Sequence, residues 1–88
     1  MVTLFASHEV SDYDKFMGAM KEPPPTEGRQ ALKIYRSTDG GRVVVVDTFD
    51  TVENAEKHRA FLENPKNQAM GESLGVIFPI TVWIAEEE

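Results

Sequence analysis

Two histidines are the residues best suited to chemistry in this 88-residue sequence. A histidine side chain takes up and releases a proton near neutral pH, so it can act as a general base on an acidic phenol or β-diketone. His8 lies where a short apolar run ends and a helical pattern begins. A side chain at such a junction can reach a pocket, and we predict His8 as a catalytic base. The alternative is a hinge histidine that hydrogen-bonds the backbone of the turn.

His58, the second histidine, falls within a predicted helix. It follows Ala55 by three residues and precedes Phe61 by three and Leu62 by four, which places its ring on the buried face of that helix. His58 is therefore either a core histidine or a pocket residue that lies near Phe61.

Four further side chains form an amphipathic stripe. Tyr13, Phe16, Met17 and Met20 recur at i, i+3, i+4 and i+7. Such a stripe fills a core or lines an apolar cavity that suits a planar ligand. Trp83, outside the stripe, could place its polar tip at a pocket rim or between subunits, as could Tyr35.

The sequence predicts neither a metal site nor a cofactor. It has no cysteine, and its two histidines do not form an i, i+4 pair. Asp12 and Asp14 are spaced like the first ligands of a calcium loop, but Phe16 and Met17 occupy the next ligand position and the required glycine. These two acids are better explained as a helix cap and a solvated face. Asp47, after a run of valines, could pair with Arg36 across a hairpin.

Helix-breaking and turn residues delimit the elements that must position these side chains. The three prolines 23–25 end the first helix, and Asp39-Gly40-Gly41 predicts a hairpin turn. Pro79 implies an edge position or a bulge in the last strand. The predicted order is a strand over 2–7, a helix capped by Ser11 and ending by Glu22, strands over 31–37 and 42–49, a helix over 51–63 capped by Asp50 and Glu53, a short helix from Asn64-Pro65 that ends at Gly71 and Gly75, and a strand over 76–85.

This β-α-β-β-α-β order predicts a single α+β domain over residues 1–88, with a ferredoxin-like four-stranded antiparallel sheet and helices on one face. Successive residues of a strand point to opposite faces of the sheet. Residues 43–46 and most of residues 76–84 are apolar whichever face they point to, which indicates burial of both sheet faces. The helices can cover only one face. We therefore expect a homodimer through the other sheet face, and we expect Val45→Asp to break the dimer or the fold.

Charge and hydropathy restrict the partners. Nine basic residues against fifteen acidic ones give a net charge of −6, which disfavours nucleic acid. No apolar run approaches the roughly 20 residues that span a bilayer, and the first residues lack the pattern of a signal peptide. A cytoplasmic protein without a membrane partner is the expectation.

Several of these features together resemble a known group of proteins. They are the start His8-x-Val10-x-Asp12-Tyr13-Asp14, the valine-rich strand after a hairpin, Asn64-Pro65, and Leu74-Gly75-Val76 before the last strand. This pattern resembles the dimeric α/β-barrel superfamily, which includes the antibiotic-biosynthesis-monooxygenase-like domains. The resemblance implies two ferredoxin-like subunits packed sheet against sheet to form a dimeric α/β barrel, each with a pocket between its sheet and its helices.

Activities in that superfamily include cofactor-free oxygenation of aromatics, isomerisation, polyketide cyclisation and haem degradation. Haem-degrading members carry an Asn on the first strand and a Trp on the third, and this sequence has neither. We therefore predict a protein that binds an apolar or aromatic small molecule, as a cofactor-independent monooxygenase or cyclase with His8 as base. The alternative is a non-catalytic dimerisation or ligand-sensing module. A cavity into which His8 and His58 both open would favour the first.

Overall fold

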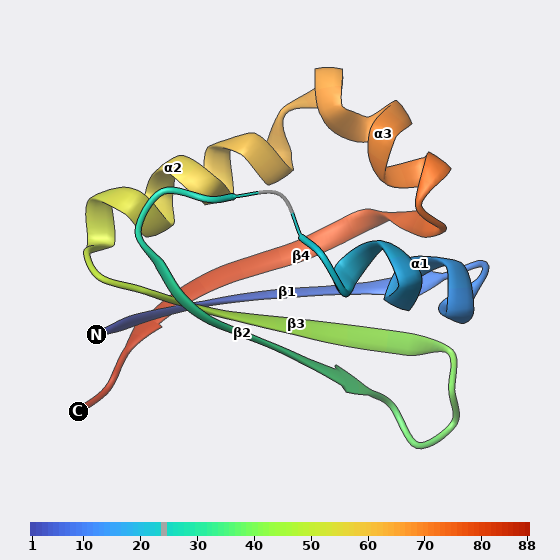
Figure 1. Ribbon diagram of the computed structural model, residues 1–88, viewed down its shortest axis with the longest axis horizontal. Coiled ribbons are helices and arrows are strands. Elements are labelled where there is room, and N and C mark those ends of the chain that lie inside the picture. Colours follow the sequence, from blue (N-terminus) through green and yellow to red (C-terminus); the bar gives the residue numbers. More distant parts are fainter. Residues whose placement is uncertain (24) are drawn as a thin grey trace.

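A computed structural model describes residues 1–23 and 25–88 of the chain. Pro24, in the predicted proline connector, lies outside the described residues. Within these described residues, four strands and three α-helices follow one another (Figure 1). Their bounds are β1 Val2–Val10, α1 Tyr13–Met20, β2 Arg29–Arg36, β3 Arg42–Phe49, α2 Val52–Glu63, α3 Gln68–Ser73 and β4 Val76–Glu86, with a 3-10 turn, η1, at Pro65–Asn67 between α2 and α3.

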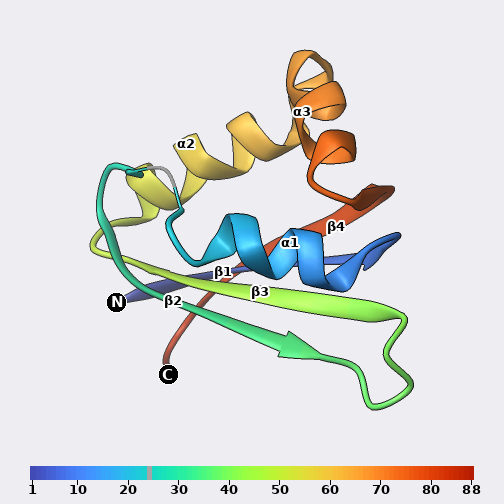
Figure 2. The same ribbon diagram turned by 45° about the vertical axis from the view of Figure 1, so that its right-hand side comes forward.

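The strands form one antiparallel sheet in the order β2-β3-β1-β4. All three α-helices lie on the same face of this sheet, as the two views in Figures 1 and 2 show. This is the ferredoxin-like arrangement predicted from the element order. None of the helices in the described part of the chain is long and apolar enough to cross a membrane.

His8 lies inside β1, which corrects its predicted place at the junction between strand and helix. β1 extends to Val10, and His8 pairs with Val43 of β3. On the β4 side the register shifts, because Ser7 faces Thr81 while Glu9 faces Ile77. The three residues of β4 centred on Pro79 therefore face a single residue of β1, His8, which makes this part of β4 a bulge. Pro79 was expected at an edge or a bulge, and β4 satisfies both descriptions.

The helix caps differ from the predicted ones. Asp12 caps α1 by accepting a hydrogen bond from the Lys15 N–H at 3.0 Å. Ser11 does not cap the helix, because its backbone N–H and its hydroxyl both donate to the Gly75 carbonyl, at 2.8 and 3.3 Å. The start of α1 is thereby tied to the start of β4.

The cap of α2 is Thr51, whose hydroxyl accepts from the Asn54 N–H at 3.1 Å. The predicted pairing of Asp50 with Glu53 does not form, because Asp50 instead accepts from the Asn54 side-chain amide at 2.9 Å. Asn64 does cap the following 3-10 turn, with Pro65 at its start, as the sequence predicts.

The two faces of the sheet have different environments. Alternate residues of β3, from Val43 to Phe49, lie under the helices and are buried. Val45 belongs to this helix-covered face, so a charge there acts on the core and not on the opposite face. We call the opposite face the open face. It carries an apolar group of side chains, Phe5, Tyr35, Val44, Val46 and Trp83, among polar residues that include Thr3, Ser7, Lys33 and Thr48.

Candidate functional site

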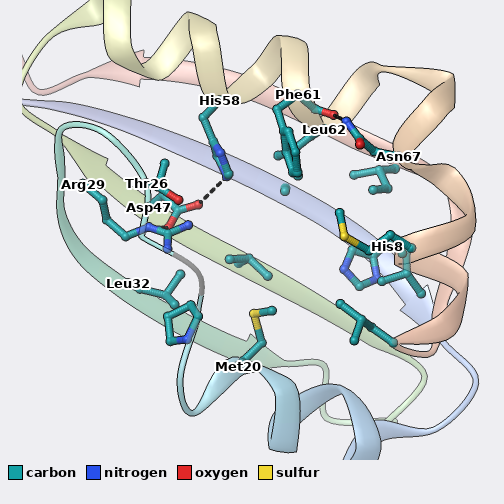
Figure 3. Close-up of a pocket in the computed structure, with 18 of the residues that line it drawn as sticks. His8, Met20, Thr26, Arg29, Leu32, Asp47, His58, Phe61, Leu62 and Asn67 are labelled. Carbon is teal, nitrogen blue, oxygen red and sulfur yellow. Dashed lines mark hydrogen bonds and ion pairs between the residues drawn. The ribbon is translucent and has the colours of Figure 1, made fainter.

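A cavity of about 450 Å³ lies between the helix-covered face of the sheet and the helices (Figure 3). Side chains from all four strands and all three α-helices line it. Most of its wall is apolar, with Phe16 and Met20 from α1, Val45 from β3 and Leu62 from α2 among the lining residues. The connection between α1 and β2, including Thr26 and Glu27, forms a further part of the wall. The chain therefore encloses a space of the size that small-molecule sites have.

His8 lines one end of this cavity, with 3% of its surface exposed. Its Nδ1 lies 2.9 Å from the Glu9 carbonyl oxygen. Because a carbonyl only accepts, this contact assigns the proton to Nδ1 and leaves the lone pair of the neutral ring on Nε2. The edge of the ring packs against Phe16, with the ring centres 5.1 Å apart.

The surroundings of His8 favour its neutral form. Burial lowers the pKa of His8 below its usual value of 6.5; the hydrogen bond to Glu9 opposes this shift, and the positive charge of Arg42 adds to it. His8 therefore has a feature of each predicted role. Its Nδ1 makes a backbone hydrogen bond, as a structural histidine does, and its Nε2 is unprotonated, as a general base requires.

A cluster of three polar side chains lines the other end of the cavity (Figure 3). Nε2 of His58 lies 3.4 Å from Oδ2 of Asp47, and Nε of Arg29 lies 3.0 Å from Oδ1. Asp47 is 1% exposed, and a carboxylate so buried must be paired to stay ionised. We call these residues the Arg29–Asp47–His58 cluster.

The predicted partner of Asp47 was wrong. Arg36 lies beside Val43 in the register of the hairpin, and its guanidinium stacks 3.8 Å from the centre of the Tyr13 ring. Asp47 lies opposite Leu32, and it reaches Arg29 at the other end of β2. One feature of the sequence pointed to this cluster. Asp47 lies two and four residues after Val45 and Val43, so in a strand its side chain is on the same face as theirs. Arg29 gave no signal, since it precedes the predicted start of that strand.

The structure brings together five of the eight predicted site residues. They line the cavity together: His8, Phe16, Met20, His58 and Phe61. Tyr13 and Met17 are not among the lining residues; they pack against the core from α1. Trp83 is on the open face, where its ring stacks on Phe5 with centres 5.1 Å apart. The prediction of Trp83 as a pocket residue was therefore wrong, because the alternation of β4 turns it away from the helices.

Phe61 and Met70 are two apolar lining residues of the cavity that are also partly exposed to solvent. Both line the cavity, and they are 46% and 49% exposed. Phe61 also stacks on the His58 ring, with ring centres 6.0 Å apart. Lys57 lies at the surface, where its Nζ is 3.7 Å from a carboxylate oxygen of Glu27 and 3.8 Å from one of Glu53. Across residues 1–23 and 25–88, no three His, Cys, Asp or Glu side chains gather in a way that could hold a metal ion.

No protein-family model and no curated protein matches this chain. Solved structures do match it over nearly its whole length. A candidate antibiotic biosynthesis monooxygenase from Bordetella bronchiseptica superposes with a TM-score of 0.71 at 18% identity, covering 99% of this chain and 96% of that one. A Mycobacterium tuberculosis protein gives a TM-score of 0.64 at 17% identity, with 99% and 94% covered.

A Streptomyces coelicolor monooxygenase, solved in complex with nanaomycin D, has the same fold. It gives a TM-score of 0.61 at 15% identity, covering 99% of this chain and 87% of that one. At such identities the likeness concerns the fold. The resemblance seen in the sequence is thus confirmed at that level: the chain has the fold of solved proteins described as antibiotic biosynthesis monooxygenases.

Proposed function

We propose that this protein binds a small apolar or aromatic molecule in the cavity and acts on it as a cofactor-independent monooxygenase or cyclase, with His8 as general base. The observation that carries the proposal is an apolar cavity of about 450 Å³ with a buried histidine at one end, whose Nε2 lone pair is free to accept a proton. Ligand sites are commonly cavities of about 300–1,000 Å³ with a few placed polar groups. A monooxygenase of the same fold that holds nanaomycin D supports the proposal.

His8 would begin the reaction by taking the proton of an acidic hydroxyl or of an enolisable carbon. The lowered pKa keeps His8 unprotonated at neutral pH, so it is available as a base. The electron-rich anion then reacts with dioxygen. For a phenol unsubstituted at the para position, phenol plus O₂ gives a quinone plus water, which balances with all electrons coming from the substrate. In the cyclase alternative, the carbanion formed at the enolisable carbon would attack a carbonyl carbon of the same molecule, and the resulting alkoxide would take the proton back from His8.

The proposal includes a homodimer that forms through the open face. This face presents Phe5, Val44 and Val46 beside the half-exposed Trp83 and Tyr35. Contiguous apolar surface of this kind is typical of a protein interface. Two copies related by a two-fold axis would pack sheet against sheet and leave each cavity on the outer side, under its own helices. A cytoplasmic location is also part of the proposal, and the cysteine-free composition allows it.

The test uses anthrone, an enolisable tricyclic aromatic whose oxidation to anthraquinone and water has the same balance. We expect the wild-type protein to bind anthrone and to accelerate oxygen uptake. His8→Gln, which removes the base, should retain binding and slow oxygen uptake about 10²-fold, because a positioned general base contributes at least that factor. Glu56→Gln, at an exposed position of α2, is the matched control and should behave as wild type.

Oxygen electrode rates and binding isotherms measured on the same samples separate the two functions. Binding without any acceleration of oxygen uptake would favour the ligand-sensing module over the oxygenase. Absence of both would contradict the proposed function.

A further inference from the structure

The cavity is polar at both ends and apolar between them. His8 occupies one end and the Arg29–Asp47–His58 cluster the other, as Figure 3 shows. Between them the wall includes Ala6 and Val45, which pair with each other midway between the level of Asp47 and that of His8. A ligand that spans this space would meet a hydrogen-bonding group at each end and apolar surface along its length.

In the part of the chain that the structure describes, the lysine and arginine side chains of the cavity wall both have carboxylate partners. The cationic lining residues of the described chain are Arg29 and Lys57, apart from the histidines. Arg29 lies 3.0 Å from Asp47, and Lys57 lies within 3.8 Å of two glutamates. Bringing a carboxylate into this space would cost desolvation without a free partner to offset it. The electrostatics therefore favour an uncharged ligand.

Within the cluster, His58 is the residue placed to touch a ligand. Asp47 has one oxygen toward Arg29 and the other toward His58, and it is almost fully buried. Because a carboxylate only accepts, the 3.4 Å contact assigns a proton to Nε2 of His58, and the uncharged ring then has its lone pair on Nδ1. His58 lines the cavity with its side chain 12% exposed. Asp47 and Arg29 hold this ring in place, so they are positioning residues.

We propose that the Arg29–Asp47–His58 cluster is a second recognition site, in which His58 accepts a hydrogen bond from a ligand hydroxyl. The ligand class is then an uncharged, elongated, fused-ring aromatic with a hydroxyl at each end, one for His8 and one for His58. This inference rests on the proposed function, because it assumes that the cavity binds an aromatic molecule.

Three naphthalene probes test this geometry on the wild-type protein. 2,6-Dihydroxynaphthalene has hydroxyls at opposite ends, 2,3-dihydroxynaphthalene has both at one end, and 2-naphthol has a single hydroxyl. One buried hydrogen bond corresponds to roughly tenfold in affinity. We therefore expect the Kd of the 2,6-isomer, measured by calorimetry, to be about tenfold lower than those of the other two. Similar values for the two isomers would overturn the inference and leave the proposed function standing. Failure of all three to bind would contradict the proposed function itself.

Variants of the cluster provide a readout that a purely structural role would not change. His58→Phe keeps an aromatic ring but removes the acceptor, so the preference for the 2,6-isomer over the 2,3-isomer should disappear while 2-naphthol binds as before. His58→Gln retains an acceptor and should keep part of the preference, and Glu56→Gln should keep all of it. A preference that persists in His58→Phe would contradict the inference, and the wild-type comparison decides it even if that variant does not fold.

Asp47→Asn tests the charge balance. It leaves the Arg29 cation without its carboxylate partner, so 6-hydroxy-2-naphthoate, which carries a carboxylate, should gain affinity relative to 2,6-dihydroxynaphthalene. In the wild-type protein the order should be the reverse, with the naphthoate binding more weakly. Tighter binding of the naphthoate to the wild-type protein would refute the claim of an uncharged ligand.

Discussion

At the scale of single residues, the two histidines differ in what holds them. His8 is fixed by a backbone carbonyl inside an apolar environment, which favours its neutral ring. His58 is held from a side chain, because its Nε2 lies 3.4 Å from a carboxylate oxygen of the buried Asp47. The same side chain is thus suited to two tasks in one cavity. In our proposal His8 takes the proton, and His58 binds and orients the far end of the ligand.

The lowered pKa of His8 makes a prediction for the stability of the protein. The unfolded chain protonates His8 near its usual pKa of 6.5, and the folded chain only at a lower pH. Between these two pKa values the unfolded state binds more protons than the folded state. The contribution of His8 to the free energy of unfolding is therefore fully present above pH 6.5, and it decreases as the pH falls through this window.

The measurement is the thermal midpoint at about pH 7.5 and about pH 5.5, on either side of the usual histidine pKa. Other groups of the protein also contribute to any pH dependence, so the comparison between variants is decisive. The fall in midpoint should be smaller in His8→Gln than in the wild type, and Glu56→Gln should match the wild type. An equal fall in His8→Gln would show that His8 does not resist protonation in the folded state.

At the scale of elements, α2 is the helix that holds His58 and Phe61 over the sheet. Its cap, Thr51, comes two residues after the end of β3 at Phe49, so the cap fixes where the first turn starts relative to Asp47. Its exposed residues include charged pairs such as Glu53 with Lys57, which contribute little on their own. The position of the helix depends mainly on its cap and on the side chains that face the core, of which Ala55 is fully buried.

Removing the α2 cap should therefore loosen one wall of the cavity. Thr51→Ala deletes the hydroxyl that accepts from the Asn54 N–H, and we expect a loss of about 1 kcal/mol in the free energy of unfolding. Denaturant unfolding checks this value. Thr38→Ala, at an exposed position of the β2–β3 turn, is the matched control and should change stability by less than about 0.5 kcal/mol. Equal losses in the two variants would contradict the cap assignment.

At the scale of the whole molecule, each face of the sheet has its own role. The helix-covered face encloses the cavity, and the open face carries apolar side chains that we propose are covered by a second copy. Val46 is near the middle of the open face, paired with Phe5 of β1 and Lys33 of β2. Val45, one residue earlier, pairs with Ala6 and Ile34 on the opposite side and lines the cavity.

Val46→Asp should therefore convert a dimer into a monomer without unfolding it. Sedimentation equilibrium at micromolar concentration should give the mass of two chains for the wild type and of one chain for Val46→Asp. Val52→Asp, which places the same change at an exposed position at the start of α2, should remain dimeric. A wild-type protein with the mass of one chain, or a dimeric Val46→Asp variant, would sink the proposed interface. Val45→Asp should instead destabilise the fold itself.

The order of elements was determined by the sequence, because its signals are local. Proline and glycine end helices and form turns, and the branched valines of 42–49 favour a strand whatever surrounds them. The fold class and the stripe that contains Phe16 and Met20 followed from these signals. The cap of α1 did not, because Ser11 and Asp12 are both good capping residues and the choice depends on a bond to Gly75, 64 residues away.

Only the tertiary structure decided which face each strand residue occupies and which polar side chains meet. The apolar residues of β3 and β4 occur at both parities, so the sequence did not indicate that Trp83 points away from the helices. The ion pair of Arg29 with Asp47 depends on the register of β2 against β3, and the contact of Asp47 with His58 depends on how α2 packs on the sheet. His8 and His58 were visible as chemical groups from the start. The fold places them at the two ends of one cavity.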